Sequence, residues 1–137
     1  MGQTALVKRD ERNGQRLSVA LDGLERFELS AAFWWYDAER ERWSFVLASG
    51  LFRREGPRVA YEFVEKQIGL LESSRSRGSF LKLGQVQIVA DDDARVVAMA
   101  QAVSVENSGV RVSGSTLNGV RVDDAIFFKL AVPKASA

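Results

Sequence analysis

The acidic run Asp91-Asp92-Asp93 is the place in this sequence where residue type and spacing could hold a divalent cation. Hard cations such as Mg²⁺ and Ca²⁺ bind several carboxylate oxygens, and the run directly follows the short apolar segment 86–90. Its spacing is not that of an EF-hand loop, and aspartates at the start of a helix more often cap free N–H groups. We therefore expect no metal or other cofactor. A carboxylate-dependent metal enzyme that uses this acidic run is the third hypothesis for function.

Nucleophilic and acid–base catalysis have few candidate residues, because the chain contains no histidine and no cysteine. Its serine and threonine hydroxyls stand in neither a Gly-x-Ser-x-Gly nor a Ser-x-x-Lys motif. Asp123 and Asp124 precede Lys129, but Phe127 occupies the position where a nuclease would carry a further acidic residue. We therefore expect a protein that is not an enzyme and has no catalytic residues.

The three tryptophans of the chain lie between residues 34 and 43, on two apolar segments joined by the charged residues 37–42. Side chains alternate between the two faces of a strand, so Trp34 and Trp35 point in opposite directions. One of them can fill the core, whereas the other needs either a covering helix or a partner. Tryptophan, tyrosine and arginine dominate interface energetics, which favours a partner. The residues expected at this surface are Trp34, Tyr36 and Trp43, with Arg40 and Arg42 at the rim.

This aromatic hairpin leads to the first hypothesis for function. The chain would be a non-catalytic protein–protein interaction module, such as an accessory subunit, an inhibitor or an immunity-type partner of bacterial origin. Its partner would be another protein or, through self-association, a second copy of the chain.

Basic residues in the middle of the chain support a second hypothesis, a nucleic-acid-associated accessory protein. Arginine and lysine side chains at a helix start and in a loop of serine and glycine could contact phosphates. The formal net charge of +1, from 19 basic and 18 acidic residues, argues against binding through bulk charge. The residues that would make these contacts are Arg53, Arg54, Arg58, Arg75, Arg77 and Lys82.

Length and composition are those of a single-domain protein. The chain has 137 residues, of which 46% are hydrophobic, and these are enough to form one core. No apolar stretch approaches the roughly 20 residues that span a bilayer, and the first residues lack the apolar centre of a signal peptide. Since cysteine is also absent, we expect a cytoplasmic protein with no membrane association.

Hydrophobic spacing predicts an order of helix, hairpin, helix, strand, helix and hairpin. Asp residues at the start of the last helix are expected to cap it. Helices are expected over residues 15–27, 57–71 and 92–104, strands over 28–36, 43–49 and 86–90, and a closing hairpin around Asn118-Gly119.

Two registers are open for the closing hairpin. A two-residue turn pairs Leu117 with Val120, whereas a three-residue loop pairs Thr116 with Val120. We prefer the loop, because a slip of one residue moves a whole apolar set to the other face; a bulge at Asp123-Asp124 is the alternative. In the preferred register one face carries Val110, Val112, Val120, Val122, Ile126, Phe128 and Leu130.

The simplest fold for this order is α+β, with a mostly antiparallel sheet of about five strands and two or three helices packed on one face. Residues 14–132 are expected to form this single domain. Residues 1–13 are expected to be a polar, loosely ordered arm, or an edge strand if Ala5, Leu6 and Val7 join the sheet. Residues 133–137 are expected to be a C-terminal tail.

Overall fold

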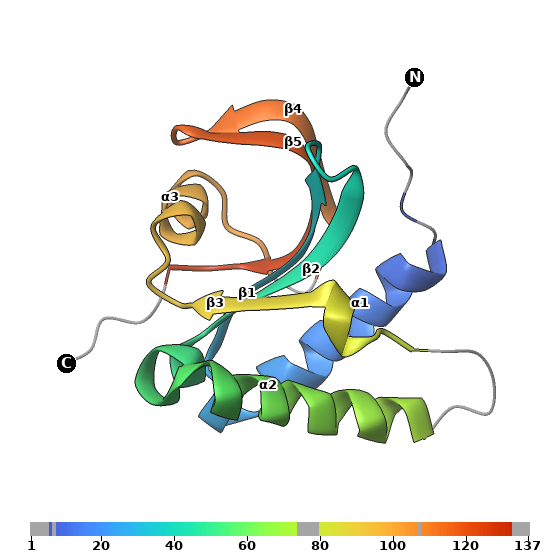
Figure 1. Ribbon diagram of the computed structural model, residues 1–137. Helices are drawn as coiled ribbons and strands as arrows, with labels where there is room; N and C mark the ends of the chain where they lie inside the picture. The colour runs from blue at the N-terminus through green and yellow to red at the C-terminus, as the bar shows by residue number, and fades with distance from the viewer. Residues whose placement is uncertain (1–5, 7, 74–79, 107, 133–137) are drawn as a thin grey trace.

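The computed structural model describes residues 6, 8–73, 80–106 and 108–132 (Figure 1). Residues 1–5 and 7 of the expected arm, which include Ala5 and Val7 of the possible edge strand, and the whole of the expected tail lie outside this part of the chain. The helices are α1 (Lys8–Asp22), α2 (Gly50–Ser73) and α3 (Ala94–Ala102), with short 3₁₀ turns η1 (Glu25–Phe27) and η2 (Leu83–Gln85). The strands are β1 (Leu29–Asp37), β2 (Arg42–Ser49), β3 (Val86–Ala90), β4 (Val110–Leu117) and β5 (Val120–Leu130).

The five strands form one mixed, mostly antiparallel sheet in the order β3-β2-β1-β5-β4. Only β2 and β3 are parallel, because α2 connects them as a crossover. The predicted α+β class is confirmed, but the helices do not share one face. Figure 1 shows α1 and α2 on one side of the curved sheet and α3 on the other. This division follows from β1 and β2, whose side chains are apolar on both faces and need cover on both.

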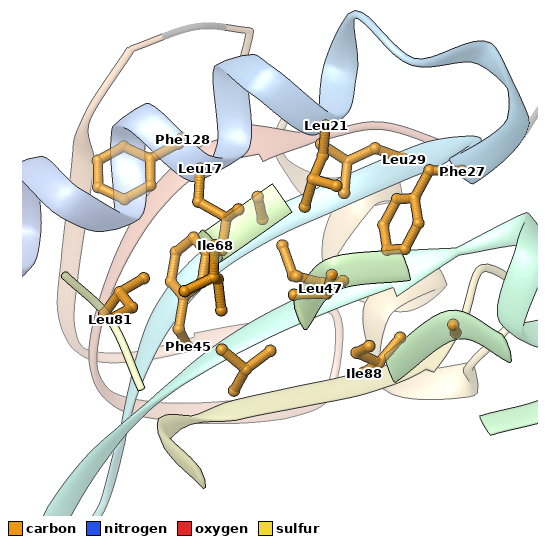
Figure 2. Packing of buried hydrophobic residues seen from close by; sticks show 14 of the residues in the cluster. Leu17, Leu21, Phe27, Leu29, Phe45, Leu47, Ile68, Leu81, Ile88 and Phe128 are labelled. Carbon is orange, nitrogen blue, oxygen red and sulfur yellow. The ribbon is translucent and has the colours of Figure 1, made fainter. Parts of the chain in front are cut away.

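The larger core lies between the sheet and the α1–α2 layer. Leu17 and Leu21 of α1 and Ile68 of α2 pack onto Phe45 and Leu47 of β2 (Figure 2). The helix expected over residues 57–71 is confirmed, and Ala60, Val64 and Ile68 form a buried stripe along one face of it. Among the described residues, no helix is long and apolar enough to span a membrane.

A smaller core lies on the opposite face, under α3. Phe33 of β1, Val46 of β2 and Phe127 of β5 meet Val96 and Met99 of α3 there. Helix α3 has only nine residues, so it covers part of this face and leaves the end of the sheet near Trp35 more open.

Helix α1 begins earlier than the sequence predicted. Residues 8–13 are its first turns rather than part of a loose arm, and Asn13 is buried. The expected boundary between arm and domain, at Asn13 and Gly14, lies inside this helix. Gly14 is accommodated because α1 passes so close to β1 that a larger residue would collide with Trp34. The expectation for residues 8–13 is therefore wrong.

Helix α2 follows β2 without a loop and contains a kink. Gly56 has φ 88°, a conformation that glycine adopts without strain, and Pro57 then starts the long second segment. The first segment, residues 50–55, was not expected from the sequence. It places Arg53 and Arg54 at the end of β2, beside the 3₁₀ turn η1 and the C-terminal end of β3.

The register of the closing hairpin is the two-residue turn, so the preferred three-residue loop is wrong. Leu117 pairs with Val120, and both Asn118 (φ 48°) and Gly119 (φ 87°) have the positive φ of such a turn. Gly114, also with positive φ, lies between the pairs Ser113–Asp124 and Ser115–Val122.

The apolar residues of this hairpin are therefore divided between the two cores. Val112, Val120, Val122 and Leu130 belong to the core under α3, whereas Ile126 and Phe128 belong to the larger core. The hairpin curves over α3 (Figure 1), where the Asn118 side chain donates to the carbonyl of Ala98 at 3.1 Å. Gly114 has φ 58° although β4 and β5 keep one register across it, and β5 shifts its register against β1 between Ala32 and Phe33. The apolar set changes faces along strands that carry these two local irregularities.

Candidate binding recess beside Trp35

The two adjacent tryptophans of β1 have different surroundings. Trp34 is fully buried under α1, packs against Phe45 and donates from Nε1 to the carbonyl of Asp10 at 3.2 Å. Trp35 is only half-buried and lies on the opposite face, where it meets Phe33 edge-on at 5.9 Å between ring centroids. The expected alternation is confirmed, and Trp35 is the one that solvent reaches.

The residues predicted from the sequence for a protein-binding surface do not lie together at the surface. Trp34 has no exposed side chain and Tyr36 is 4% exposed, so their expected position at the surface is wrong. Trp43 is half-buried, lies 5.4 Å from the ring of Tyr36 and packs on the larger core. Arg40 and Arg42 are exposed, and Arg40 lines a recess on the face opposite Trp34 and Tyr36.

This recess, of about 240 Å³, lies between the N-terminal end of α3 and strands β1, β2 and β3. Its walls come from rows of paired residues across the sheet: Trp35 pairs with Ser44, and Phe33 pairs with Val46, which in turn pairs with Gln87. We call it the Trp35 recess. Its apolar lining consists of Phe33, Trp35, Val46, Val89, Val96 and Met99.

The two carboxylates at the rim of the Trp35 recess already accept hydrogen bonds from the chain. Asp37 accepts from the backbone N–H groups of Glu39 and Arg40 at 3.0 and 3.3 Å. Asp93 accepts from those of Arg95 and Val96 at 3.0 and 3.2 Å, which confirms the expected cap of α3. Both acidic groups therefore hold local structure in place.

Three side chains at the rim that can donate hydrogen bonds have no such partner within the described chain. Arg95, Gln87 and Ser44 make no side-chain hydrogen bond or ion pair with any residue that the structure describes. Arg40 lies 3.8 Å from Asp37, an exposed and weak ion pair. The recess thus combines an apolar lining with donor groups whose capacity is unused within the described chain.

The basic residues proposed for nucleic-acid contacts are mostly engaged within the chain. Arg53 binds Asp91 at 2.6 Å, Arg54 binds Glu28, and Arg58 lies 3.7 Å from Glu62. The hydrogen bond and charge of Asp91 raise the pKa of Arg53 above its usual value. Lys82 is exposed next to η2, while Arg75 and Arg77 lie outside the described residues. The structure does not bring the described members together as free cations.

The acidic run likewise offers no open set of ligands. Asp91 is held by Arg53, and Asp93 caps α3. Within the residues that the structure describes, no three side chains of the metal-binding types come together in a way that could hold an ion.

Asp124 is a carboxylate placed inside the sheet region, with 1% of its side chain exposed. It accepts two hydrogen bonds from Arg111, at 3.0 and 2.5 Å, and one from Ser113 at 2.9 Å. Burial alone raises the pKa of a carboxyl, but the bonds from Arg111 and Ser113 outweigh it and the pKa of Asp124 lies below its usual value. The group is a satisfied structural anion between β4 and β5.

Sequence reasoning missed Trp35, Ser44, Gln87 and Arg95 as members of a common site. Alternation along β1 already separated Trp35 from Trp34, and the same alternation along β2 and β3 places Ser44 and Gln87 with Trp35. What the pattern lacked was the position of the helices, which decides which face is closed.

Comparisons with known proteins found no match on which an assignment of function could rest. No protein-family model, no curated protein and no solved structure matches the chain.

Proposed function

We propose that the chain is a non-catalytic protein-binding module and that the Trp35 recess receives a side chain of its partner. The observation that carries the proposal is the half-buried Trp35 in the wall of a concave site that has both apolar and polar residues in its lining and unpaired donors at its rim. Partly exposed tryptophans beside pockets are typical anchors of protein interfaces.

The size of the recess favours a protein segment over a metabolite. Sites for small molecules usually enclose about 300–1,000 Å³, and the Trp35 recess has about 240 Å³. Such a space suits one large side chain, while the main chain of the partner crosses the rim. Interfaces commonly gain most of their affinity from one or a few anchors of this kind.

The proposal keeps the aromatic hairpin as the binding element but changes the residues that carry it. Trp35 and Arg40 face the recess, whereas Trp34, Tyr36 and Trp43 support the hairpin from the other side. A role as an accessory subunit, inhibitor or immunity-type partner in the cytoplasm remains part of this proposal.

The two other hypotheses draw less support. Arg53, Arg54 and Arg58 are paired with carboxylates and would have to exchange them for phosphates. For a metal enzyme, Asp91 and Asp93 would have to leave Arg53 and the α3 cap.

The test is selection of binding peptides from a phage-displayed library of random peptides on the immobilised protein. We expect the selected peptides to carry an aromatic or large aliphatic residue, and to lose about 2 kcal/mol, or about thirtyfold in affinity, on Trp35→Ala. Val19→Ala is the matched control, because Val19 is 56% exposed on α1, on the opposite face.

Equal binding to wild type and Trp35→Ala contradicts the proposal, and so does a library that yields no binder. Light scattering on the same samples tests the other expected partner, a second copy of the chain. A dimer that persists in Trp35→Ala places any self-contact elsewhere on the molecule.

A further inference from the structure

The rim of the Trp35 recess carries donors without a partner. The carboxylates of Asp37 and Asp93 each accept two backbone N–H groups on one oxygen, Oδ1. The donors of Arg95, Gln87 and Ser44 have no partner among the described residues. A bound segment that brings an acceptor to these donors gains hydrogen bonds that the described chain alone does not make.

Arg95 decides which acceptor fits best. It lies in the first turn of α3, where its backbone N–H is tied to Asp93 while its side chain is exposed. A guanidinium binds a carboxylate through two parallel hydrogen bonds, which are stronger than bonds to neutral acceptors. Gln87 and Ser44, on the neighbouring strands, can donate to the same group or to the peptide backbone beside it.

We propose that the partner of the Trp35 recess is an acidic peptide segment, with an apolar side chain against Trp35 and a neighbouring Asp or Glu carboxylate on Arg95. This inference rests on the proposed function. The small recess holds the anchor alone, so the carboxylate comes from a flanking side chain of a continuous segment.

The charges of Asp37 and Asp93 limit how much negative charge this rim accepts. Both carboxylates line the same recess as Arg40 and Arg95, so the four groups sum to zero. One or two carboxylates near the arginines are favoured, whereas a dense polyanion such as a nucleic acid meets repulsion from both aspartates.

The inference is tested by ¹⁹F NMR on the full chain labelled with 5-fluorotryptophan. The three signals are assigned with Trp35→Phe and Trp43→Phe. The probes are the capped tripeptides acetyl-Glu-Phe-Glu-amide, acetyl-Gln-Phe-Gln-amide and acetyl-Lys-Phe-Lys-amide at millimolar concentration. We expect the Glu peptide to shift the Trp35 signal with saturation, the Gln peptide to bind about fivefold more weakly, and the Lys peptide to bind more weakly still.

Arg95→Gln should reduce the affinity for the Glu peptide to that for the Gln peptide. Lys66→Gln, an exposed residue of α2, is the control and should change nothing. Urea unfolding confirms that both variants keep their stability, since both side chains are on the surface.

The outcomes separate this inference from the function on which it rests. If the Glu and Gln peptides shift the Trp35 signal with equal affinity, the proposed contact between a peptide carboxylate and Arg95 is wrong, while the apolar contact with Trp35 stands. If acetyl-Gln-Phe with a free C-terminus binds more tightly than the Glu peptide, the carboxylate comes from a chain end and the flanking side chain is wrong. If an oligothymidylate displaces the Glu peptide, the acidic peptide is wrong. If no probe shifts Trp35 and the phage selection also fails, both proposals fall.

Discussion

The indole of Trp34 lies directly against the backbone of Gly14, where α1 crosses β1. A Cβ atom at Gly14 would lie 2.4 Å from Nε1 of Trp34 and 2.9 Å from Cε1 of Phe45, both far inside contact distance. The same indole donates to the carbonyl of Asp10, one turn earlier in the helix. Gly14 therefore allows α1 to close one face of the sheet completely, and Trp35 is left to the other face.

Replacing Gly14 with alanine is expected to destabilise the protein by about 1–3 kcal/mol, because the new methyl group overpacks the core. Alanine alone would favour a helix by about 1 kcal/mol over glycine. Gly69 is the control, since it lies exposed within α2 with nothing within 4 Å of its Cβ position. Gly69→Ala is expected to stabilise the protein by about 0.5–1 kcal/mol in urea unfolding. A Gly14→Ala variant as stable as the wild type would contradict the close contact.

Replacing Trp34 and replacing Trp35 should change the free energy of unfolding by different amounts. Trp34→Ala leaves a large cavity under α1 and is expected to cost about 3–5 kcal/mol of the free energy of unfolding. Trp35→Ala should cost clearly less, because Trp35 is partly in solvent. Urea unfolding of both variants measures this order, and a larger loss for Trp35→Ala would contradict the assignment of the faces.

Asp124 should contribute to the pH dependence of the free energy of unfolding. Its folded pKa is lowered, so its contribution is complete above the unfolded pKa of about 3.9 and disappears as the pH falls through the folded pKa. Asp124→Asn removes this titration. The difference in free energy of unfolding between wild type and Asp124→Asn should therefore narrow from about pH 6 to about pH 3. A constant or widening difference would show that the carboxylate is not stabilised by its partners.

Replacing Arg111, the ion-pair partner of Asp124, should lower the free energy of unfolding, although the Arg111 side chain is largely in solvent. The Arg111 side chain is 58% exposed, whereas that of Asp124 is 1% exposed. Arg111→Met leaves Ser113 as the remaining side-chain donor among those described, and we expect a loss of about 1–3 kcal/mol at neutral pH. Arg121→Met is the control, because its ion pair with Asp123 is exposed on both sides. Equal stability of the two variants in urea unfolding would contradict the role of Arg111.

Local patterns predicted those elements whose signals lie within a few residues. The stripe of Ala60, Val64 and Ile68 marks one face of α2, and Asp93 caps α3 as its position before an apolar-periodic run suggested. These features depend on neighbours along the chain. The five-stranded α+β class followed from the order of such elements.

The features that were not predicted depend on contacts between distant residues. Gly14 lies inside α1, where Trp34, twenty positions later, leaves no room for a Cβ atom. Alternation separates Trp34 from Trp35, but which of them is covered depends on the position of α1. The sequence therefore indicated the aromatic hairpin but not which of its two faces is covered by helices.

The predicted register of the closing hairpin was wrong for a related reason. Asn118 offers a test of the register that the structure shows. Asn118 has φ 48° in the two-residue turn, and its side chain donates to the carbonyl of Ala98 and to Oε1 of Gln101 in α3. Asn118→Gly keeps the turn but removes both bonds, whereas Asn118→Ala also strains the backbone. We expect a loss of about 1 kcal/mol for Asn118→Gly and a larger loss for Asn118→Ala in urea unfolding.

Thr116→Ala is the matched control, because Thr116 is exposed on the edge strand β4 near the same turn. Its effect should stay within about 0.5 kcal/mol. In a three-residue loop Asn118 would not need positive φ at this position, and glycine and alanine would then be tolerated alike. An Asn118→Ala variant as stable as Asn118→Gly would therefore count against the two-residue turn, while a graded loss ties the curved hairpin to α3 through this one side chain.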